Sequence, residues 1–141
     1  MFQNVLLAFD GSEPARRAAQ MVAGLVRFCP SPVVLRVVVA YDPIPSYLGE
    51  PQLQSVIDER IAEAETVLRQ ALDVLGETPA DIHTEILEGP AADAILRVAQ
   101  TRGNDLIVMG SRGLGQITGL LLGSQSQKVL NHAPCPVLVV R

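Results

Sequence analysis

Met109-Gly110-Ser111-Arg112-Gly113, which directly follows the apolar run Asp105-Leu106-Ile107-Val108, decides the fold together with Gly123-Ser124-Gln125-Ser126. The apolar run predicts a buried strand, and the glycines after it allow a backbone to approach a ligand closely or to adopt positive φ. A helical pattern begins at Gly123-Ser124, so free N–H groups and the positive end of a helix dipole lie beside the glycine loop. Such an arrangement holds phosphate groups. The sequence therefore predicts a nucleotide site.

Strand-like and helix-like patterns alternate along the whole chain. The expected strands are residues 4–9, 33–40, 82–87, 105–108 and 137–140, and the expected helices between them are 15–26, 53–75, 91–99 and 123–133. Ser12 is placed to cap the first helix, and Pro14 suits its first turn. Alternation of this kind produces a parallel sheet with helices on both faces, joined by right-handed crossovers. We expect an α/β fold with one doubly wound five-stranded parallel sheet, as a single domain over residues 1–141.

Composition excludes several classes of protein. The net charge of −4 argues against a nucleic-acid-binding protein, which normally carries a basic stripe. No apolar run approaches the roughly 20 residues of a membrane-spanning helix, and Met1-Phe2-Gln3-Asn4 lacks the basic start of a signal peptide, so we expect a cytoplasmic protein. Cys29 and Cys135 lie far apart and belong to no C-x-x-C pair, so no metal site is expected.

The predicted site lies where two strands end. In an open parallel sheet, ligands bind beyond the carboxyl ends of the strands, where the strand order reverses. Asp10-Gly11 follows the first strand and Gly110 follows the fourth, so both would line one crevice if these strands are neighbours. The Asp10 side chain could then hydrogen-bond a ribose or a base, while a plain turn at Asp10-Gly11 is the alternative.

Other nucleotide motifs are absent. A dinucleotide site would place G-x-G-x-x-G after the first strand, where only Gly11 stands, and a P-loop needs a Gly-Lys pair, which does not occur. A receiver domain would need an acceptor aspartate after the third strand, but Leu87-Glu88-Gly89 offers only a glutamate.

Three segments resemble the universal stress protein family. They are residues 5–12 (VLLAFDGS), the motif Gly110-x-x-Gly113-x9-Gly123-Ser124, and residues 132–140 (HAPCPVLVV). The resemblance covers the whole chain, and the glycine motif is the signature of the ATP-binding branch of the family. It implies a strand order of 3-2-1-4-5, as in the adenine nucleotide alpha hydrolase-like folds, so the first and fourth strands would flank the crevice.

The resemblance also implies a ligand, ATP with Mg²⁺, and a set of contacts. The adenine would lie near Ala8 and Asp10 and against the backbone of the second strand, at Val37 or alternatively Val39. The predicted nucleotide-binding residues are Ala8, Asp10, Val37, Met109, Gly110, Arg112, Gly113, Gly123, Ser124, Gln125 and Ser126, with the triphosphate on those from Gly110 onward.

Two features depart from a plain binding loop. Gln125 stands where the family commonly has a small or β-branched residue, and its amide could donate to phosphate or could crowd the site. Residues 114–122 are unusually apolar at Ile117, Leu120, Leu121 and Leu122. They could form a lid over the ligand or pack against a second subunit.

The sequence favours binding over catalysis. Hydrolysis of ATP needs a positioned water, usually a base, and a metal. Asp10 is the only obvious acidic candidate, and contact with ribose or base would take it away from the γ-phosphate. We expect no catalytic residue and at most weak hydrolysis or autophosphorylation, with Ser124 as acceptor by analogy.

The expected role is a nucleotide-dependent sensor or regulator in a stress response. The alternatives are a slow ATPase or autophosphorylating enzyme and a nucleotide-independent dimeric interaction protein. An apolar edge left bare invites association, and the resemblance suggests antiparallel pairing of the last strand with its mate. We expect a homodimer through Val137, Leu138, Val139 and Val140.

Overall fold

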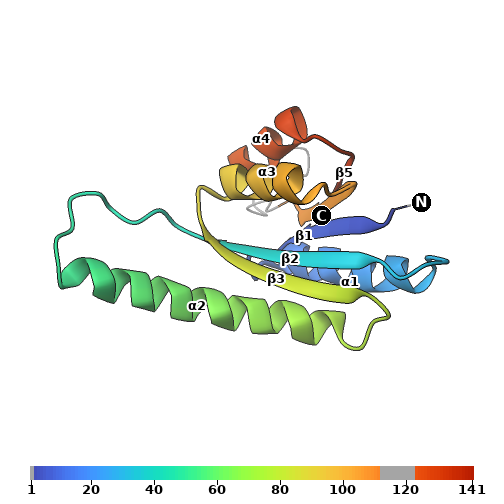
Figure 1. The fold of residues 1–141 in the computed structure, drawn as a ribbon, viewed down its shortest axis with the longest axis horizontal. Coiled ribbons are helices and arrows are strands. Elements are labelled where there is room, and N and C mark those ends of the chain that lie inside the picture. Colours follow the sequence, from blue (N-terminus) through green and yellow to red (C-terminus); the bar gives the residue numbers. More distant parts are fainter. Residues whose placement is uncertain (1, 112–122) are drawn as a thin grey trace.

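The computed structural model describes residues 2–111 and 123–141, which form a parallel sheet of five strands with helices on both faces (Figure 1). The strands are β1 (Asn4–Ala8), β2 (Val34–Tyr41), β3 (Asp81–Glu88), β4 (Leu106–Gly110) and β5 (Val137–Val140). Their order across the sheet is β3-β2-β1-β4-β5, which confirms the predicted order. Because β1 lies between β2 and β4, the carboxyl ends of these three parallel strands lie side by side in the middle of the sheet.

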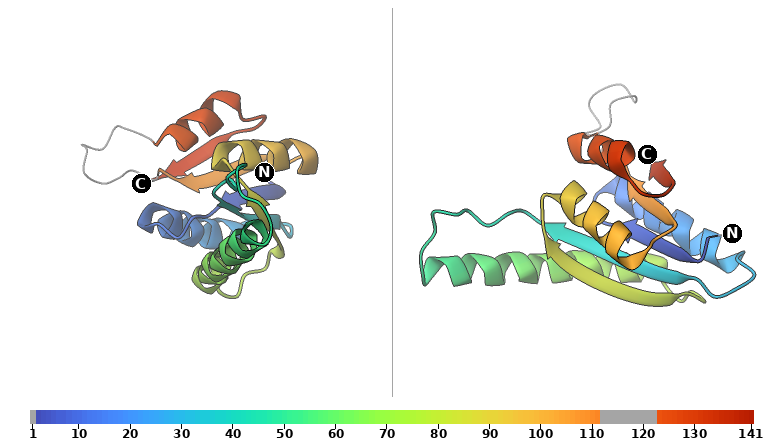
Figure 2. Two further views of the ribbon diagram at one scale, coloured as in Figure 1. Left: turned by 90° about the vertical axis from the view of Figure 1, so that its left-hand side faces the viewer. Right: turned by 45° about the horizontal axis from the view of Figure 1, so that its top comes forward.

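The helices form two layers. They are α1 (Glu13–Arg27), α2 (Gln52–Leu75), α3 (Ala91–Arg102) and α4 (Ser124–His132). The helices α1 and α2 cover one face of the sheet, and α3 and α4 cover the other (Figure 2). Both faces of the central strands are therefore buried, which explains why those strands are almost continuously apolar in sequence.

The start of α1 forms as its sequence predicts. Ser12 is the N-cap, and its Oγ accepts a hydrogen bond from the Ala15 backbone nitrogen at 3.2 Å. Proline occupies the first turn, where its missing N–H group costs no hydrogen bond. Small side chains on the buried face, Ala15, Ala18 and Ala19, let the helix lie close to the sheet.

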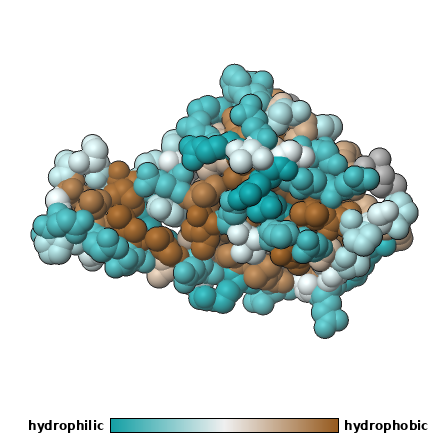
Figure 3. All heavy atoms as spheres, in the orientation of Figure 1, coloured by the Kyte–Doolittle hydropathy of each residue, from teal (hydrophilic) through white to brown (hydrophobic). Residues whose placement is uncertain are grey.

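The helix α2 extends past the end of the sheet (Figures 1 and 2). It has 24 residues, but its buried ones are Ala64, Ala71 and Leu75, all in the second half. The first half and residues 42–51 project together, and Figure 3 shows apolar surface over this part of the molecule. Tyr47 on the connection is 84% exposed. The connection is held to the helix by Arg60, whose Nη1 donates to the carbonyl oxygens of Asp42 and Pro43.

Among the described residues, none of the helices has the length and apolar character that crossing a membrane requires.

Candidate functional site

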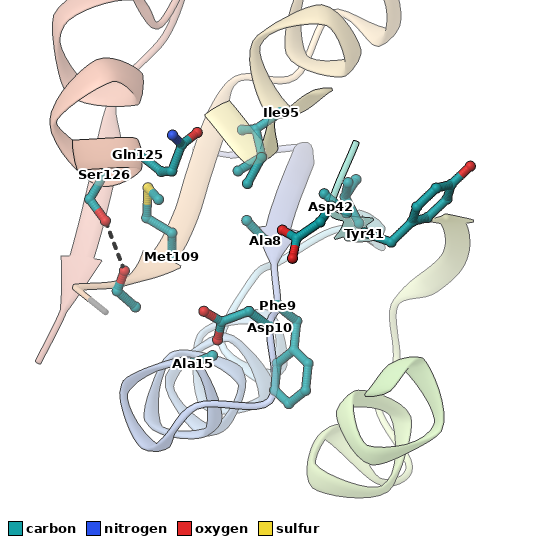
Figure 4. Close-up of a pocket in the computed structure, with 14 residues that line it drawn as sticks. Ala8, Phe9, Asp10, Ala15, Tyr41, Asp42, Ile95, Met109, Gln125 and Ser126 are labelled. Carbon is teal, nitrogen blue, oxygen red and sulfur yellow. Dashed lines mark hydrogen bonds between the residues drawn. The ribbon is translucent and has the colours of Figure 1, made fainter. Parts of the chain in front are cut away.

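A cavity lies at the carboxyl ends of β1, β2 and β4 (Figure 4). The strands and the loops that follow them contribute Ala8, Phe9, Asp10, Val38, Ala40, Tyr41, Asp42, Met109 and Gly110, and the helices contribute Ala15, Ala91, Ile95, Gln125 and Ser126. The cavity thus occupies the place where the strand order reverses.

The floor of the cavity is a row of three side chains on neighbouring strands. Ala8 of β1 is the register partner of Val38 in β2 and of Met109 in β4. Register partners in adjacent strands point to the same face of a sheet, so the three side chains form one apolar surface. Ile95 of α3 lies on the same side of the sheet and lines the cavity wall. A flat apolar group can lie on this row.

Two carboxylates lie at the cavity, Asp10 after β1 and Asp42 after β2 (Figure 4). The Oδ1 atom of Asp10 accepts a hydrogen bond from the Ser12 backbone nitrogen at 3.0 Å, which ties this side chain to the start of α1. Asp42 directly follows β2 and Asp10 stands two residues after the end of β1, so both are positioned by the ends of central strands. They are suited to accept hydrogen bonds from hydroxyl or amino groups of a ligand.

Within the described residues, the first turn of α4 has no side-chain cap. Its N-cap is Gly123, with φ −60° and ψ 154°. The helix bonding begins at Gln127, whose nitrogen donates to the Gly123 oxygen at 3.0 Å. The N–H groups of residues 124–126 therefore have no partner within the helix. Such a helix end attracts anions.

A buried serine holds this helix against the glycine loop. Ser126 is 1% exposed, and its Oγ lies 3.4 Å from the carbonyl oxygen of Gly110 (Figure 4) and 3.4 Å from that of Ser111. Because a hydroxyl is a donor and both partners are acceptors, Ser126 can donate to either carbonyl. The first turn of α4 is thereby positioned relative to the end of β4.

Gly110 has a different structural role from the one its motif suggests. A Cβ atom at this position would meet the backbone of α1, at Pro14 and Ala15. We expected this glycine to leave room for phosphate, but the close approach is between β4 and the start of α1. Its lack of a side chain is required by packing, whatever the ligand.

Gln125 makes a contact that connects two helices. Its Oε1 accepts a hydrogen bond from the Ala92 backbone nitrogen at 2.8 Å. The helix α3 begins after Pro90, which has no side-chain cap of its own, so Gln125 satisfies one of the free N–H groups in the first turn of α3. Neither predicted role of this residue, donation to phosphate or crowding, includes this contact.

Most of the described site residues come together. Ala8, Asp10, Met109, Gly110, Gln125 and Ser126 line the cavity, while Gly123 and the exposed Ser124 lie at the open end of α4 without lining it. Arg112, Gly113 and the apolar segment 114–122 lie outside the described residues.

The predicted contact with the β2 backbone, at Val37 or Val39, stays a prediction, but the side chains of β2 that face the cavity belong to other residues. Val37 does not line the cavity: its side chain is 0% exposed and packs on the opposite face, under α1 and α2. Val39 lines a second cavity on the α2 side, together with Arg60 and Glu63. The strand residues at the main cavity are Val38 and Ala40. The physical reason is that successive side chains of a strand point to opposite faces of the sheet, so Val38 and Ala40 face the cavity while Val37 and Val39 face α1 and α2.

The comparisons with known proteins agree with this architecture. The sequence model of the universal stress protein family matches residues 1–141. A universal stress protein of Thermus aquaticus is 46% identical over 141 residues, which cover 100% of both chains. The solved universal stress protein UspA from Lactobacillus plantarum is 28% identical, with a TM-score of 0.81 over 99% of this chain and 98% of that one.

A further solved structure, a universal stress protein in complex with cAMP, is 27% identical, with a TM-score of 0.74 over 99% of this chain and 97% of that one. The family match over the whole chain, the relative from Thermus aquaticus and the fold shared with UspA lead to one conclusion. The chain belongs to the universal stress protein family.

Proposed function

We propose that this chain binds an adenine nucleotide, ATP in the cell, and acts as a nucleotide-dependent regulator of a cytoplasmic stress response. The observation that carries the proposal is the row Val38–Ala8–Met109, which ends beside the open first turn of α4. An apolar surface for a flat base lies next to N–H groups for phosphate. The relative solved with cAMP, at 27% identity, supports the same class of ligand.

The parts of the nucleotide match different parts of the cavity. The adenine ring lies on the apolar row, and Asp10 and Asp42 accept hydrogen bonds from ribose hydroxyls or from the base. The phosphates lie at the N–H groups of residues 124–126, with Arg112 and Gly113 as further contacts and Mg²⁺ accompanying ATP. No residue is assigned to the metal.

Regulation fits the site better than turnover does. Hydrolysis requires a base and a positioned water at the γ-phosphate. Asp10 is tied to the start of α1 by Ser12, and Asp42 stands at the end of β2, on the side of the cavity away from α4. We therefore propose that occupancy by nucleotide changes the contacts of the protein, with at most weak hydrolysis.

We further propose that the regulator is a homodimer. The strand β5 pairs with β4 and forms one edge of the sheet. Its residues Val137, Leu138, Val139 and Val140 are apolar, and an apolar edge with unpaired backbone groups is a template for pairing with a second copy.

The test is nucleotide binding by a variant in which the cavity is filled. Ala40→Leu adds three carbon atoms at a half-buried position that lines the cavity. Ala62→Leu makes the same change on the exposed face of α2 and is the control. Thermal unfolding is followed with and without ATP, AMP, cAMP and GTP, and a ligand at a hundred times its Kd adds about 2.7 kcal/mol to the free energy of unfolding.

We expect adenine nucleotides to raise the Tm of the wild type and of Ala62→Leu, and to raise that of Ala40→Leu much less. A wild-type Tm that no nucleotide changes would contradict the proposal. Equal shifts in both variants would place the ligand elsewhere.

A further inference from the structure

We propose that Gln125 makes the site selective for ligands that carry a phosphate group. The side-chain oxygen is engaged by α3, and the two N–H donors of the amide remain on a residue that lines the cavity. This inference rests on the proposed function, since it concerns how the same site distinguishes a nucleotide from a nucleoside.

The orientation of the amide follows from its partner. The Ala92 backbone nitrogen is a donor, and it lies 2.8 Å from Gln125 Oε1. An amide NH₂ cannot accept this hydrogen bond, so the side chain cannot flip without losing it. The planar amide then holds Nε2 in a fixed place, with two N–H donors and no acceptor. Within the described part of the chain, no hydrogen bond occupies these donors.

The side chain is held at the cavity wall from both ends. Figure 4 shows Gln125 extending from α4 towards α3, and its residue lines the cavity. Next to it, Lys128 of α4 and Asp93 of α3 form an ion pair with a distance of 2.6 Å. The two helices are thus tied by two contacts, made by residues about one turn apart on α4 and by adjacent residues on α3. The amide is positioned before any ligand arrives, which lowers the entropy cost of binding.

The place of Gln125 on its helix indicates which part of a ligand it contacts. It is the second residue of α4, so its own backbone N–H is one of those left open in the first turn. A phosphate at that helix end lies beside the amide, whereas the apolar row of β1, β2 and β4 is the place for the base. A donor at this point favours an anionic acceptor, because hydrogen bonds to charged groups are the stronger ones.

The experiment uses a variant that keeps the hydrogen bond with α3 and replaces the N–H donors of the side chain by a charged acceptor. Gln125→Glu retains an acceptor for the Ala92 N–H, and a carboxylate is also favourable at a helix N-terminus. It replaces the donors by a negative charge at the cavity. Gln127→Glu makes the same change of charge two residues along α4, at an exposed position, and is the matched control. Kd values for ATP and for adenosine are measured by calorimetry, with Tm recorded for each variant.

We expect Gln125→Glu to weaken ATP binding by about tenfold to a hundredfold, the loss of a hydrogen bond to a charged group. Adenosine binding should stay within about twofold of the wild type, and Gln127→Glu should leave both unchanged. The Tm of Gln125→Glu without ligand should equal that of the wild type. Gln125→Met, which loses acceptor and donors together, should lower both the Tm and the affinity for ATP.

Three results would overturn the inference. ATP binding by Gln125→Glu equal to that of Gln127→Glu would show that the amide does not contact phosphate. Equal weakening for ATP and adenosine would show that it only shapes the cavity. A wild type that binds neither compound would instead refute the proposed function, and the inference with it.

Discussion

Gly110 and Ala15 lie in contact through their backbones: a Cβ atom on Gly110 would stand 2.5 Å from the Ala15 nitrogen and 2.7 Å from the carbonyl carbon of Pro14. These atoms belong to main chain, which cannot move aside as a flexible side chain can. The end of β4 and the first turn of α1 are therefore packed at a distance that only glycine permits.

Gly110→Ala is expected to destabilise the fold, because α1 must shift away from β4 to admit the methyl group. Overpacking of this kind costs about 1–3 kcal/mol. Urea unfolding without ligand measures it. Gly24→Ala in the same helix is the control: a Cβ there meets nothing within 4 Å, so this variant should gain about 0.5–1 kcal/mol. Equal stability of the two variants would mean that β4 and α1 are not packed as described.

Val139→Pro is expected to prevent dimer formation while leaving the protomer folded. Ile107 donates to the Pro136 oxygen and Ser111 to the Val140 oxygen, so alternate residues of β5 turn their backbone groups to β4. Val139 lies between them and turns its N–H to the free edge. Proline removes that donor without removing a bond to β4.

Analytical ultracentrifugation of Val139→Pro and Val139→Thr gives the comparison, since threonine keeps both the N–H and the branched shape. We expect a monomer for proline and a dimer for threonine. A dimer with proline would place the interface on another surface, and a monomeric wild type would remove the homodimer proposal.

Arg60→Met is expected to expose the connection between β2 and α2 to proteolysis. Arg60 donates to the carbonyl oxygen of Asp42 at 2.6 Å and also to that of Pro43. Hydrogen bonds from a charged donor contribute about 1.5–3 kcal/mol, so their loss should speed chymotrypsin cleavage at Tyr47 by about tenfold or more. Arg69→Met is the control, because Arg69 donates to Thr66 on its own helix. Cleavage at the same rate in both variants would show that Arg60 does not hold the connection.

Stability is expected to fall at high pH because of Cys135. Burial raises the pKa of its thiol, and the Asp105 carboxylate raises it further, while a backbone hydrogen bond with Ile107 opposes the shift. Above about pH 8.5 the thiol of the unfolded chain loses its proton first, which favours unfolding. This contribution is present below that pH and is lost as pH rises towards the folded-state pKa.

Urea unfolding of the wild type and of Cys135→Ser between pH 7 and pH 10 measures this effect. The difference in stability between the two proteins should move in favour of the serine variant above about pH 8.5. A difference that stays constant with pH would contradict the raised pKa.

The sheet and its helices could be predicted because their signals are local. Ser12 and Pro14 indicate the start of α1, and the expected cap forms because the Ala15 N–H donates to Ser12 Oγ. Each expected strand lies within two residues of the observed one at either end. The strand order could not be predicted from local signals, because alternation of strands and helices does not determine it. The resemblance to a known family supplied it.

The sequence does not indicate which side chains of β2 face the cavity, and the reason is physical. The run Val37-Val38-Val39-Ala40 is apolar on both faces because β2 lies inside the sheet and is covered on both sides. Without alternation between polar and apolar residues, nothing in the run indicates which side chains face the cavity. The pairing of Ala8 with Val38 decides it, and this pairing exists only in the folded sheet.

The contact between Gln125 and Ala92 could not be predicted either. The two residues are 33 positions apart, and the contact depends on how α3 and α4 pack together. The missing cap at Pro90 is visible in the sequence, but it does not show which residue of another helix replaces the cap.

The uneven burial of α2 makes it a natural attachment point. At about 1.5 Å per residue, a helix of 24 residues is about 36 Å long, and its buried side chains begin at Ala64. The floor of the cavity and the register of the sheet do not depend on the tip near Tyr47. A peptide epitope or a fluorescent label inserted there would lie outside the buried core of the protein. Assembly could then be followed without disturbing the site.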